Sequence, residues 1–346
     1  MESNPALERF LKSIPLFEYV QPPEMMDLLR LLRPVVLEEG QLLFGEGDPG
    51  KAMWVLGEGC EVNVLATPPG GDRPITVATA RAGDTVGEMA LVDDGRRSGT
   101  AVVTHGGTAH EIDAVDFQVL RDSYTPAAFK MLRKVAVDLC RKIRATTDRI
   151  APSSNLTLDA PPVQFRPLPS PELVDQFGPF RKMPEVVKLA LAQKLTLVET
   201  DGVQPIFGEG EHADAAYFVV SGEVTVGRAG KTLATLGPGT MFGLVAAIDQ
   251  GGRSASCVAT GPCRLLRLAD ADFDALFARG NRFAYHLVDL VARQLVSHLR
   301  DTNQLYLQTK QAILPEAEPV QAFQMDSASS LSELKLDLDL ELELSL

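Results

Sequence analysis

The stretch GEMALVDDGRR at residues 87–97 recurs as GLVAAIDQGGR at residues 243–253, and FGEGD at residues 44–48 recurs as FGEGE at residues 207–211. This internal duplication predicts two copies of one structural unit. The two FGEG motifs are 163 positions apart, whereas the segments that begin at Gly87 and Gly243 are 156 positions apart. The first copy therefore holds seven extra residues between its two motifs. The intervening sequence LATPPGGDRP, residues 65–74, is rich in turn formers and predicts a longer hairpin loop there.

Length and charge limit the possible functions. A chain of 346 residues can form two domains, each with its own core. The net charge is -13, of which residues 311–346 contribute -7 through eight acidic side chains and Lys335. Such an acidic body repels phosphate backbones, and no basic stripe offsets it, so the sequence argues against nucleic acid as a partner.

Targeting signals and disulfides have little support. No apolar run approaches the roughly 20 residues that span a bilayer, and the first residues do not resemble a signal peptide. We therefore expect a cytoplasmic protein without a membrane span. The cysteines lack CxxC spacing, which favours buried free thiols over disulfides or a metal site. They are Cys60, Cys140, Cys257 and Cys263.

Hydrophobic periodicity predicts the same order of elements twice. Helical spacing at residues 6–33 is followed by short β-type runs between turns and then by a helix, which predicts an antiparallel barrel or jelly roll with helical flanks. The runs cover 35–117 and 197–268, and the helices 126–148, 183–195 and 281–307. The predicted divisions are a first domain at 1–150, a proline-rich extended linker at 151–170, a second domain at 171–310 and an acidic tail at 311–346.

The repeated motif resembles the phosphate-binding cassette of the cyclic nucleotide-binding domain family, found in catabolite-activator transcription factors and in regulatory subunits of cyclic AMP-dependent protein kinase. The resemblance rests on the cassette, on FGEG before it and on Trp54-Val55-Leu56 with Gly59. It covers residues 10–148 and 172–308. It implies a mainly β fold of two tandem cyclic nucleotide-binding-like β-barrels (jelly rolls), with cAMP or cGMP as a ligand rather than a cofactor.

The residue types of the first cassette suit a cyclic nucleotide. Arg97 can meet both free oxygens of a cyclic phosphate with its planar fork, and backbone N–H groups after Gly87 would add donors. Glu88 offers only acceptors, which suits a ribose 2′-hydroxyl. The alternative is an ordinary salt bridge between Glu88 and Arg97. The predicted ligand-binding residues are Gly87, Glu88, Ala90, Leu91, Arg97, Ser98 and Gly99; they do not reveal the base.

The second cassette departs from the family pattern. Leu244 stands where the family has glutamate, although Gly243, Arg253 and Ser254 remain. Losing the acceptor for the ribose hydroxyl should cost about 1.5 to 3 kcal/mol. We therefore expect a weak or empty second site, or else a pocket for a different anion.

Other motifs do not support catalysis or metal binding. GEGDPG at residues 45–50 matches a dinucleotide fingerprint, but a strand rather than a helix follows it. His105 and His110 lack an evident third metal ligand. No catalytic constellation stands out, so we expect no enzyme. The predicted elements also leave no place for a winged helix, which argues against a transcription factor and favours the tandem layout of a kinase regulatory subunit.

These patterns predict a non-enzymatic, cyclic nucleotide-responsive regulatory protein that acts on a protein partner. Ligand binding in the first domain should reposition the helix at 126–148, with Leu139 or Ile143 as an apolar lid over the pocket. The alternative is a nucleotide-independent scaffold, or adaptor, recruited through its C-terminal strand.

The acidic tail ends in an alternating pattern that predicts a partner-binding strand with one apolar face. A solvated acidic extension is the alternative, because a lone strand has no stability in water. The predicted partner-binding residues are Leu334, Leu336, Leu338, Leu340, Leu342 and Leu344, followed by Leu346.

Overall fold

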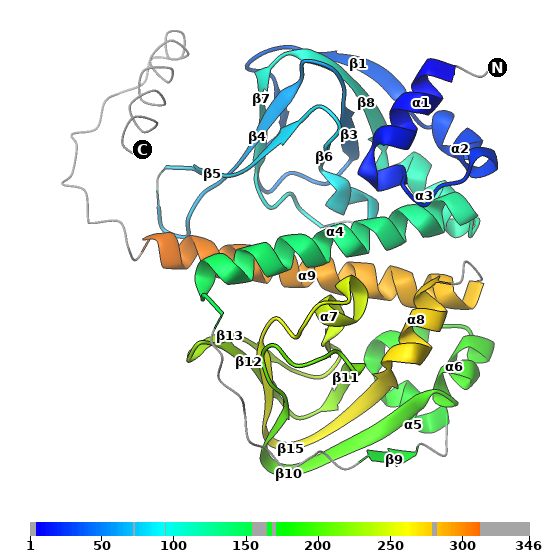
Figure 1. The fold of residues 1–346 in the computed structure, drawn as a ribbon, viewed down its shortest axis with the longest axis vertical. Helices are drawn as coiled ribbons and strands as arrows, with labels where there is room; N and C mark the ends of the chain where they lie inside the picture. Colours follow the sequence, from blue (N-terminus) through cyan, green and yellow to red (C-terminus); the bar gives the residue numbers. More distant parts are fainter. Residues whose placement is uncertain are drawn as a thin grey trace. The chain divides into compact units, whose positions relative to one another are not determined.

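The first half of the chain folds as a jelly roll of two four-stranded antiparallel sheets in a computed structural model, which describes residues 5–71, 73–93, 95–153, 165–167, 171–278 and 282–311 (Figure 1). The strand orders are β1-β8-β3-β6 and β2-β7-β4-β5. This arrangement confirms the predicted fold class. The strands are β1 (Arg33–Leu37), β2 (Leu42–Phe44), β3 (Ala52–Leu56), β4 (Glu61–Ala66), β5 (Ile75–Arg81), β6 (Thr85–Val86), β7 (Thr100–His105) and β8 (Gly107–Asp113).

The second half repeats the barrel with fewer and longer strands. Two of them, β10 and β15, pair from Leu195↔Leu268 to Phe207↔Cys257 and replace two pairs of shorter strands in the first half. The sheet order is β13-β12-β15-β10-β9, with β11 pairing β14 and β15. The strands are β9 (Phe165–Pro167), β10 (Leu195–Phe207), β11 (Ala215–Ser221), β12 (Val224–Arg228), β13 (Lys231–Leu236), β14 (Met241–Phe242) and β15 (Ser256–Ala269).

Two connections bear on the sequence predictions. The hairpin between β4 and β5 has its loop at 67–74, whereas β12 and β13 meet in a two-residue turn at Ala229 and Gly230, both with positive φ. The longer loop of the first copy is therefore confirmed. The proline-rich segment predicted as a linker contributes β9, which pairs with residues 196–198 of β10 and so belongs in part to the second sheet.

Helices flank both barrels. Asp113 caps α3 by accepting hydrogen bonds from the N–H groups of Val115 and Asp116, and Thr125 caps α4 ahead of Pro126. The helices of the first half are α1 (Pro5–Ser13), η1 (Pro15–Phe17), α2 (Pro22–Leu29), η2 (Glu88–Leu91), α3 (Ala114–Asp122) and α4 (Pro126–Ile150). Those of the second half are α5 (Pro171–Gln176), η3 (Gly178–Lys182), α6 (Glu185–Ala192), α7 (Leu244–Asp249), α8 (Asp270–Ala278) and α9 (Arg282–Gln311).

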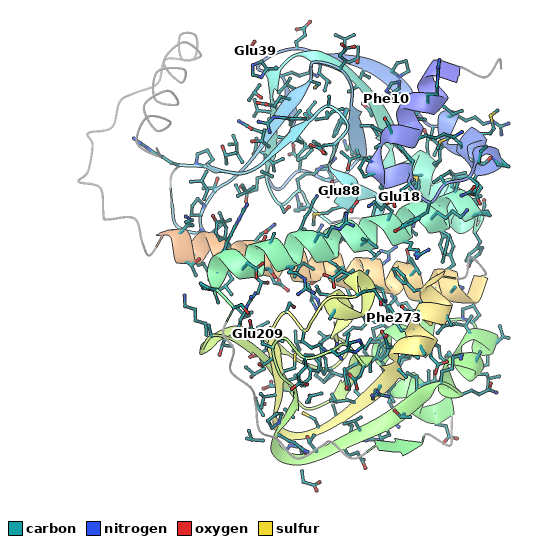
Figure 2. The ribbon with its side chains drawn as sticks, viewed as in Figure 1. Phe10, Glu18, Glu39, Glu88, Glu209 and Phe273 are labelled. Atoms are coloured by element: carbon teal, nitrogen blue, oxygen red, sulfur yellow. The ribbon has the colours of Figure 1, made fainter. Side chains whose placement is uncertain are left out.

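The long helices α4 and α9 pack along each other between the two barrels, as Figure 1 shows. Leu139 of α4 and Leu295 of α9 belong to one buried cluster that also takes in apolar residues of both barrels. Residues Met1–Gln311 accordingly form one compact unit. In Figure 2, Glu88 lies on the side of the first barrel that faces α4.

The sequence also predicted a partner-binding tail and no membrane span. The predicted partner-binding leucines of the tail lie outside the described residues. Within the described residues, no helix is both long enough and apolar enough to cross a membrane.

Candidate functional site

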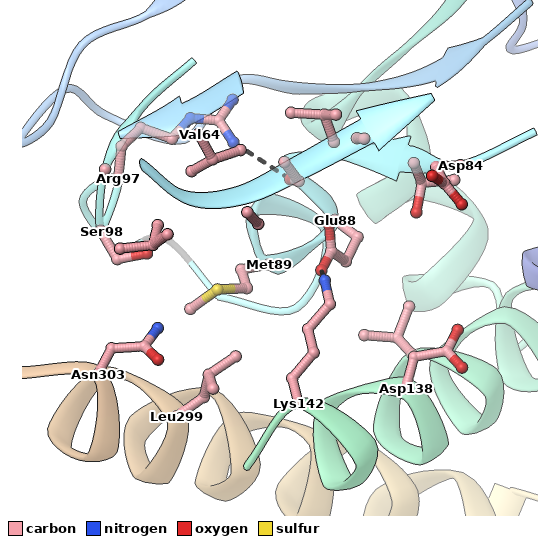
Figure 3. A pocket seen from close by; sticks show the side chains of 18 of the residues that line it. Val64, Asp84, Glu88, Met89, Arg97, Ser98, Asp138, Lys142, Leu299 and Asn303 are labelled. Atoms are coloured by element: carbon pink, nitrogen blue, oxygen red, sulfur yellow. Dashed lines mark hydrogen bonds and ion pairs between the residues drawn. The ribbon is translucent and has the colours of Figure 1, made fainter. Parts of the chain in front are cut away.

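A cavity of about 570 Å³ lies in the first half, between the barrel and the helices α4 and α9 (Figure 3). Its volume is within the range of about 300 to 1,000 Å³ that is typical of small-molecule sites. Of the residues predicted to bind ligand, it brings together Gly87, Glu88, Ala90, Arg97, Ser98 and Gly99. The two halves of the first cassette therefore meet at one cavity.

Arg97 is held in the cavity wall by backbone carbonyls and aromatic rings. Its Nη1 donates to the carbonyl of Gly87 (3.1 Å) and its Nη2 to that of Ala52 (2.5 Å), while the guanidinium lies 4.0 Å from the Phe44 ring centroid. The side chain is 8% exposed, and burial lowers its pKa. No carboxylate of the described residues forms an ion pair with Arg97, although the negative charges of Glu88 and Asp48 act on it and oppose the lowering of its pKa by burial.

Gly87 is required by this arginine. Its φ is +83°, in the left-handed region, and a Cβ built on it would lie 2.7 Å from Nη1 of Arg97. Gly99 also has a packing reason, since a Cβ there would lie 2.6 Å from the carbonyl oxygen of Leu65 on the neighbouring strand. These two glycines thus support the backbone of the cassette.

Glu88 is 7% exposed and pairs with Lys142 of α4, whose Nζ donates to Oε1 (Figure 3). Burial raises the pKa of Glu88, but the charge and hydrogen bond of Lys142 outweigh it, so the net pKa is lowered. The alternative of a Glu88–Arg97 salt bridge is wrong in this structure, because the cation within ion-pair distance of Glu88 is Lys142. Lys142 was not found from the sequence; only its place on the helix that faces the cassette could have indicated it.

The backbone N–H groups after Gly87 were predicted to donate to the ligand, but Leu91 and Ala90 depart from this prediction. Leu91 does not line the cavity and is buried in the core. The N–H of Ala90 donates to the carbonyl of Gly87 at 3.1 Å, which closes the short helix η2.

Helix α4 lines the cavity with Val135 and Ala145 rather than with the residues predicted as its lid. Leu139 is buried in the core and does not line the cavity, and Ile143 lines a different cavity in the second half, so neither predicted residue covers the first cavity in this structure. Instead, Leu299 and Asn303 of α9 point toward the first cavity, as Figure 3 shows. The sequence prediction missed them because it treated each half as a separate domain.

The second half has a smaller cavity of about 120 Å³ around its own cassette. Gly243, Arg253 and Ser254 all line it, together with Leu244. His298 also lines it, and burial lowers the pKa of this histidine to about 4, so it is neutral near pH 7. This cavity is well below the volume of typical small-molecule sites.

Arg253 repeats the geometry of Arg97 with one decisive addition. Its Nη1 donates to Gly243 (3.0 Å) and its Nη2 to Ala215 (2.8 Å), as in the first half, but Nη2 also pairs with Asp214 at 2.7 Å. Asp214 lies 163 positions after Lys51, so a carboxylate replaces a cation of the first copy. Asp214 also pairs with Arg267 at 2.9 Å, so it offsets only part of the charge of the two arginines.

Asp214 was missed by sequence reasoning, although the repeat offset held the signal. Burial raises the pKa of Asp214, but hydrogen bonds and charges from Arg267 and Arg253 outweigh it and the net pKa is lowered. Asp214 is therefore ionised at neutral pH. An anionic ligand at Arg253 would therefore be repelled by the carboxylate of Asp214.

Metal binding has no support among the described residues, which hold no cluster of three or more His, Cys, Asp or Glu side chains able to bind an ion. His105 lies beside Glu61, with 3.6 Å between Nδ1 and Oε1, and His110 stacks near Phe10.

The family model of the cyclic nucleotide-binding domain matches residues 34–124 and again 201–280. The chain is a tandem cyclic nucleotide-binding domain protein. The two matched segments contain the two cassettes and most of the two barrels, which agrees with the fold.

Several named proteins are similar to this tandem protein over part of its length. The cyclic AMP receptor protein of Thermus thermophilus is 41% identical over 117 residues, 32% of this chain and 54% of that protein. A cyclic nucleotide-gated potassium channel of Rhizobium etli is 32% identical over 130 residues, 38% of this chain and 34% of the channel. The chain thus spans about half of the first relative and about a third of the second.

One solved structure with similarity to the tandem protein covers most of it. The regulatory domain of Toxoplasma gondii PKA with cAMP has a TM-score of 0.32 and 20% identity, covering 79% of this chain and 93% of that chain.

Proposed function

We propose that the first half binds a cyclic purine nucleotide, cAMP or cGMP, and that its occupancy regulates a protein partner without catalysis. The observation that carries this proposal is the contrast between the two cassettes. The first has a cavity of about 570 Å³ and an arginine without a carboxylate partner among the described residues. The second has about 120 Å³ and an arginine paired with Asp214.

The phosphate of the ligand fits the chemistry around Arg97. A buried guanidinium without an ion-pair partner gains most from a ligand that brings one negative charge. A cyclic nucleotide carries a single charge on two free oxygens, which a planar fork can engage together. Arg97 now donates to two backbone carbonyls, and an anion in the cavity would share these donors.

The ribose fits Glu88. A carboxylate has lone pairs for several donors, so Glu88 can accept from a 2′-hydroxyl while Lys142 holds its Oε1. Because Lys142 keeps this carboxylate ionised, Glu88 is an acceptor at neutral pH. This arrangement favours a ribonucleotide over its 2′-deoxy analogue.

The base has mainly apolar walls with a polar group at one side. Val64 and Val77 of the first barrel, Met89 of the cassette and Leu299 of α9 line the cavity, and Asn303 adds an amide that can both donate and accept. Flat apolar surfaces suit a purine ring, and an amide can pair with its edge.

A regulatory role follows the family and the architecture. The related proteins named above include a receptor and a channel whose names refer to cyclic nucleotides. The ligand would touch α4 through Lys142 and α9 through Asn303, so it could shift helices that join both halves. No second function is favoured by a specific observation.

The test is calorimetric titration of the full chain with cAMP, cGMP and their 2′-deoxy forms. We expect binding of at least one ribonucleotide, and a weakening of about 100-fold or more in Arg97→Ala, because truncating one partner of a buried charge contact costs about 3 to 5 kcal/mol. Glu88→Gln keeps the cation and should lower the preference for the 2′-hydroxyl about 10-fold. Circular dichroism must show that both variants are folded. Absence of heat and of a melting shift at millimolar nucleotide with folded wild-type protein would refute the proposal.

A further inference from the structure

The two halves contact each other through pairs of residues that the repeat makes equivalent. Arg144 of α4 donates to Asp249 of the second cassette (2.8 and 2.9 Å), and Arg300 of α9 donates to Asp93 of the first (2.5 and 3.0 Å). Arg300 lies 156 positions after Arg144, and Asp249 lies 156 after Asp93. Each long helix therefore binds the cassette loop of the opposite half in the same way.

Equivalent residues also meet at the centre of the contact between the two halves. Phe129 and Tyr285, again 156 positions apart, face each other with ring centroids 6.0 Å apart. In a two-fold dimer, residue i contacts j while j contacts i, and a residue near the axis meets its own equivalent. The contact between the halves has both properties, so it has the geometry of a two-fold dimer interface joined into one chain.

One pair of contacts breaks the equivalence. Arg121 of α3 is 6% exposed and donates to Asp289 of α9 and to the carbonyls of Leu91 and Val92. The equivalent contact joins Arg133 of α4 to Phe277 of α8, with 5.7 Å from the guanidinium carbon to the ring centroid. Phe277 replaces Arg121, and Asp289 replaces Arg133, at the 156-residue offset.

Only a mixed pair of halves satisfies these side chains. Two copies of the first half would place the buried Arg121 against the partly buried Arg133 twice, bringing like charges together. Two copies of the second half would place Phe277 against Asp289 twice, which puts a carboxylate on the face of an aromatic ring. The mixed pair gives one ion pair and one cation–π contact instead.

We infer that the interface between the halves selects the opposite half over a second copy of the same half, so that the chain closes on itself as an internal heterodimer with approximate two-fold symmetry. Arg121 and Asp289 are the residues that set this specificity. The second half then has a role that requires no ligand of its own, since its α9 completes the wall of the first cavity through Leu299 and Asn303. This inference about pairing does not depend on nucleotide binding.

The test uses the full chain with a protease site inserted within residues 154–164 and cut after folding. Native mass spectrometry and sedimentation of the nicked protein should show one first fragment with one second fragment, at the mass of the intact 37.4 kDa chain. Mixing isotope-labelled and unlabelled nicked protein should exchange fragments only into such mixed pairs. Separation of the fragments at micromolar concentration, or homodimers of either fragment as abundant as mixed pairs, would overturn the inference.

Charge variants test the two residues directly. Asp289→Arg places a second guanidinium against Arg121 and should weaken association of the nicked halves about 100-fold or more, and Asp289→Asn should weaken it less. Arg121→Asp combined with Asp289→Arg should recover part of the loss. Arg33→Asp, which breaks the exposed Arg33–Asp116 pair away from this interface, is the matched control and should leave association unchanged. The inference would be contradicted if Asp289→Arg associated as tightly as wild type. It would also be contradicted if the loss of affinity in the double variant equalled the sum of the losses in Arg121→Asp and Asp289→Arg alone.

Discussion

Two arginines with the same backbone contacts differ because of one neighbouring carboxylate. Arg97 and Arg253 each donate to a glycine and an alanine carbonyl and each lie 4.0 Å from a phenylalanine ring centroid. The conserved geometry between the copies therefore does not by itself make an anion site. In the second copy, Asp214 pairs with Arg253 and places a negative charge beside it.

The Glu88–Lys142 pair has no counterpart in the second half, and this gives a prediction for Leu244. Leu244 and His298 stand 156 positions after Glu88 and Lys142. Leu244→Glu should bury a carboxylate beside a neutral histidine and lower the free energy of unfolding by about 3 kcal/mol. Adding His298→Lys should recover most of the loss, as measured by denaturant unfolding of the full chain. Equal stability of the single and double variants would contradict this view of the pair.

The sequence alone identified part of the site for a physical reason. Gly87 and Arg97 were predicted from the repeated cassette and its family resemblance, and the structure adds that Gly87 has a left-handed φ and leaves room for the guanidinium of Arg97. Asp214 and Lys142 were not predicted, since each acts on the cassette from a distant part of the chain. Aligning the copies outside the cassette would have revealed Asp214 against Lys51, but not Lys142, whose role depends on how α4 packs.

Helix α4 serves both halves because successive residues of a helix point in different directions. Lys142 faces the first cavity, Ile143 lines the second, and Arg144 binds Asp249 of the second cassette. A rotation of about 100° per residue distributes these neighbours around the helix. Any movement of Lys142 therefore moves groups that contact the second half.

Nucleotide binding should change hydrogen exchange in both long helices. We expect slower exchange at α4 near Lys142 and at α9 near Leu299 and Asn303, because ligand contacts there reduce local opening. Exchange mass spectrometry with and without saturating nucleotide measures this, and Arg97→Ala supplies the control. Protection confined to the first barrel would show that α9 does not take part in binding.

Strands and helices were predictable to different extents. The alternating runs of the first copy gave the jelly roll, and helical periodicity gave α4 (Pro126–Ile150) and α9 (Arg282–Gln311) close to their ends. The continuous pairing of β10 with β15 and the strand β9 within the proline-rich segment were missed. Both depend on pairing with distant strands, which local periodicity does not contain.

One buried cluster joins the two halves, although each barrel also encloses a cluster of its own. The buried cluster that contains Phe117 and Leu139 of the first half also contains Phe218, Phe273 and Leu295 of the second. The sequence predicted two domains, each with its own core, but not the further cluster between them, because a repeat indicates two units but not the surface by which they pack. The tail hypothesis remains a prediction, since its leucines lie outside the described residues.

This shared cluster predicts that nucleotide in the first half stabilises the second half as well. Because apolar residues of both halves are buried in one cluster, the described residues up to Gln311 should unfold in a single transition. A ligand at 100 times its Kd adds about 2.7 kcal/mol to the free energy of unfolding, which for a unit of this size raises Tm by about 4 °C. Differential scanning calorimetry of the full chain should therefore show one peak that moves as a whole, with no shift in Arg97→Ala. Two peaks, of which only one responds to nucleotide, would mean that the barrels unfold independently and that α4 and α9 transmit no stabilisation between them.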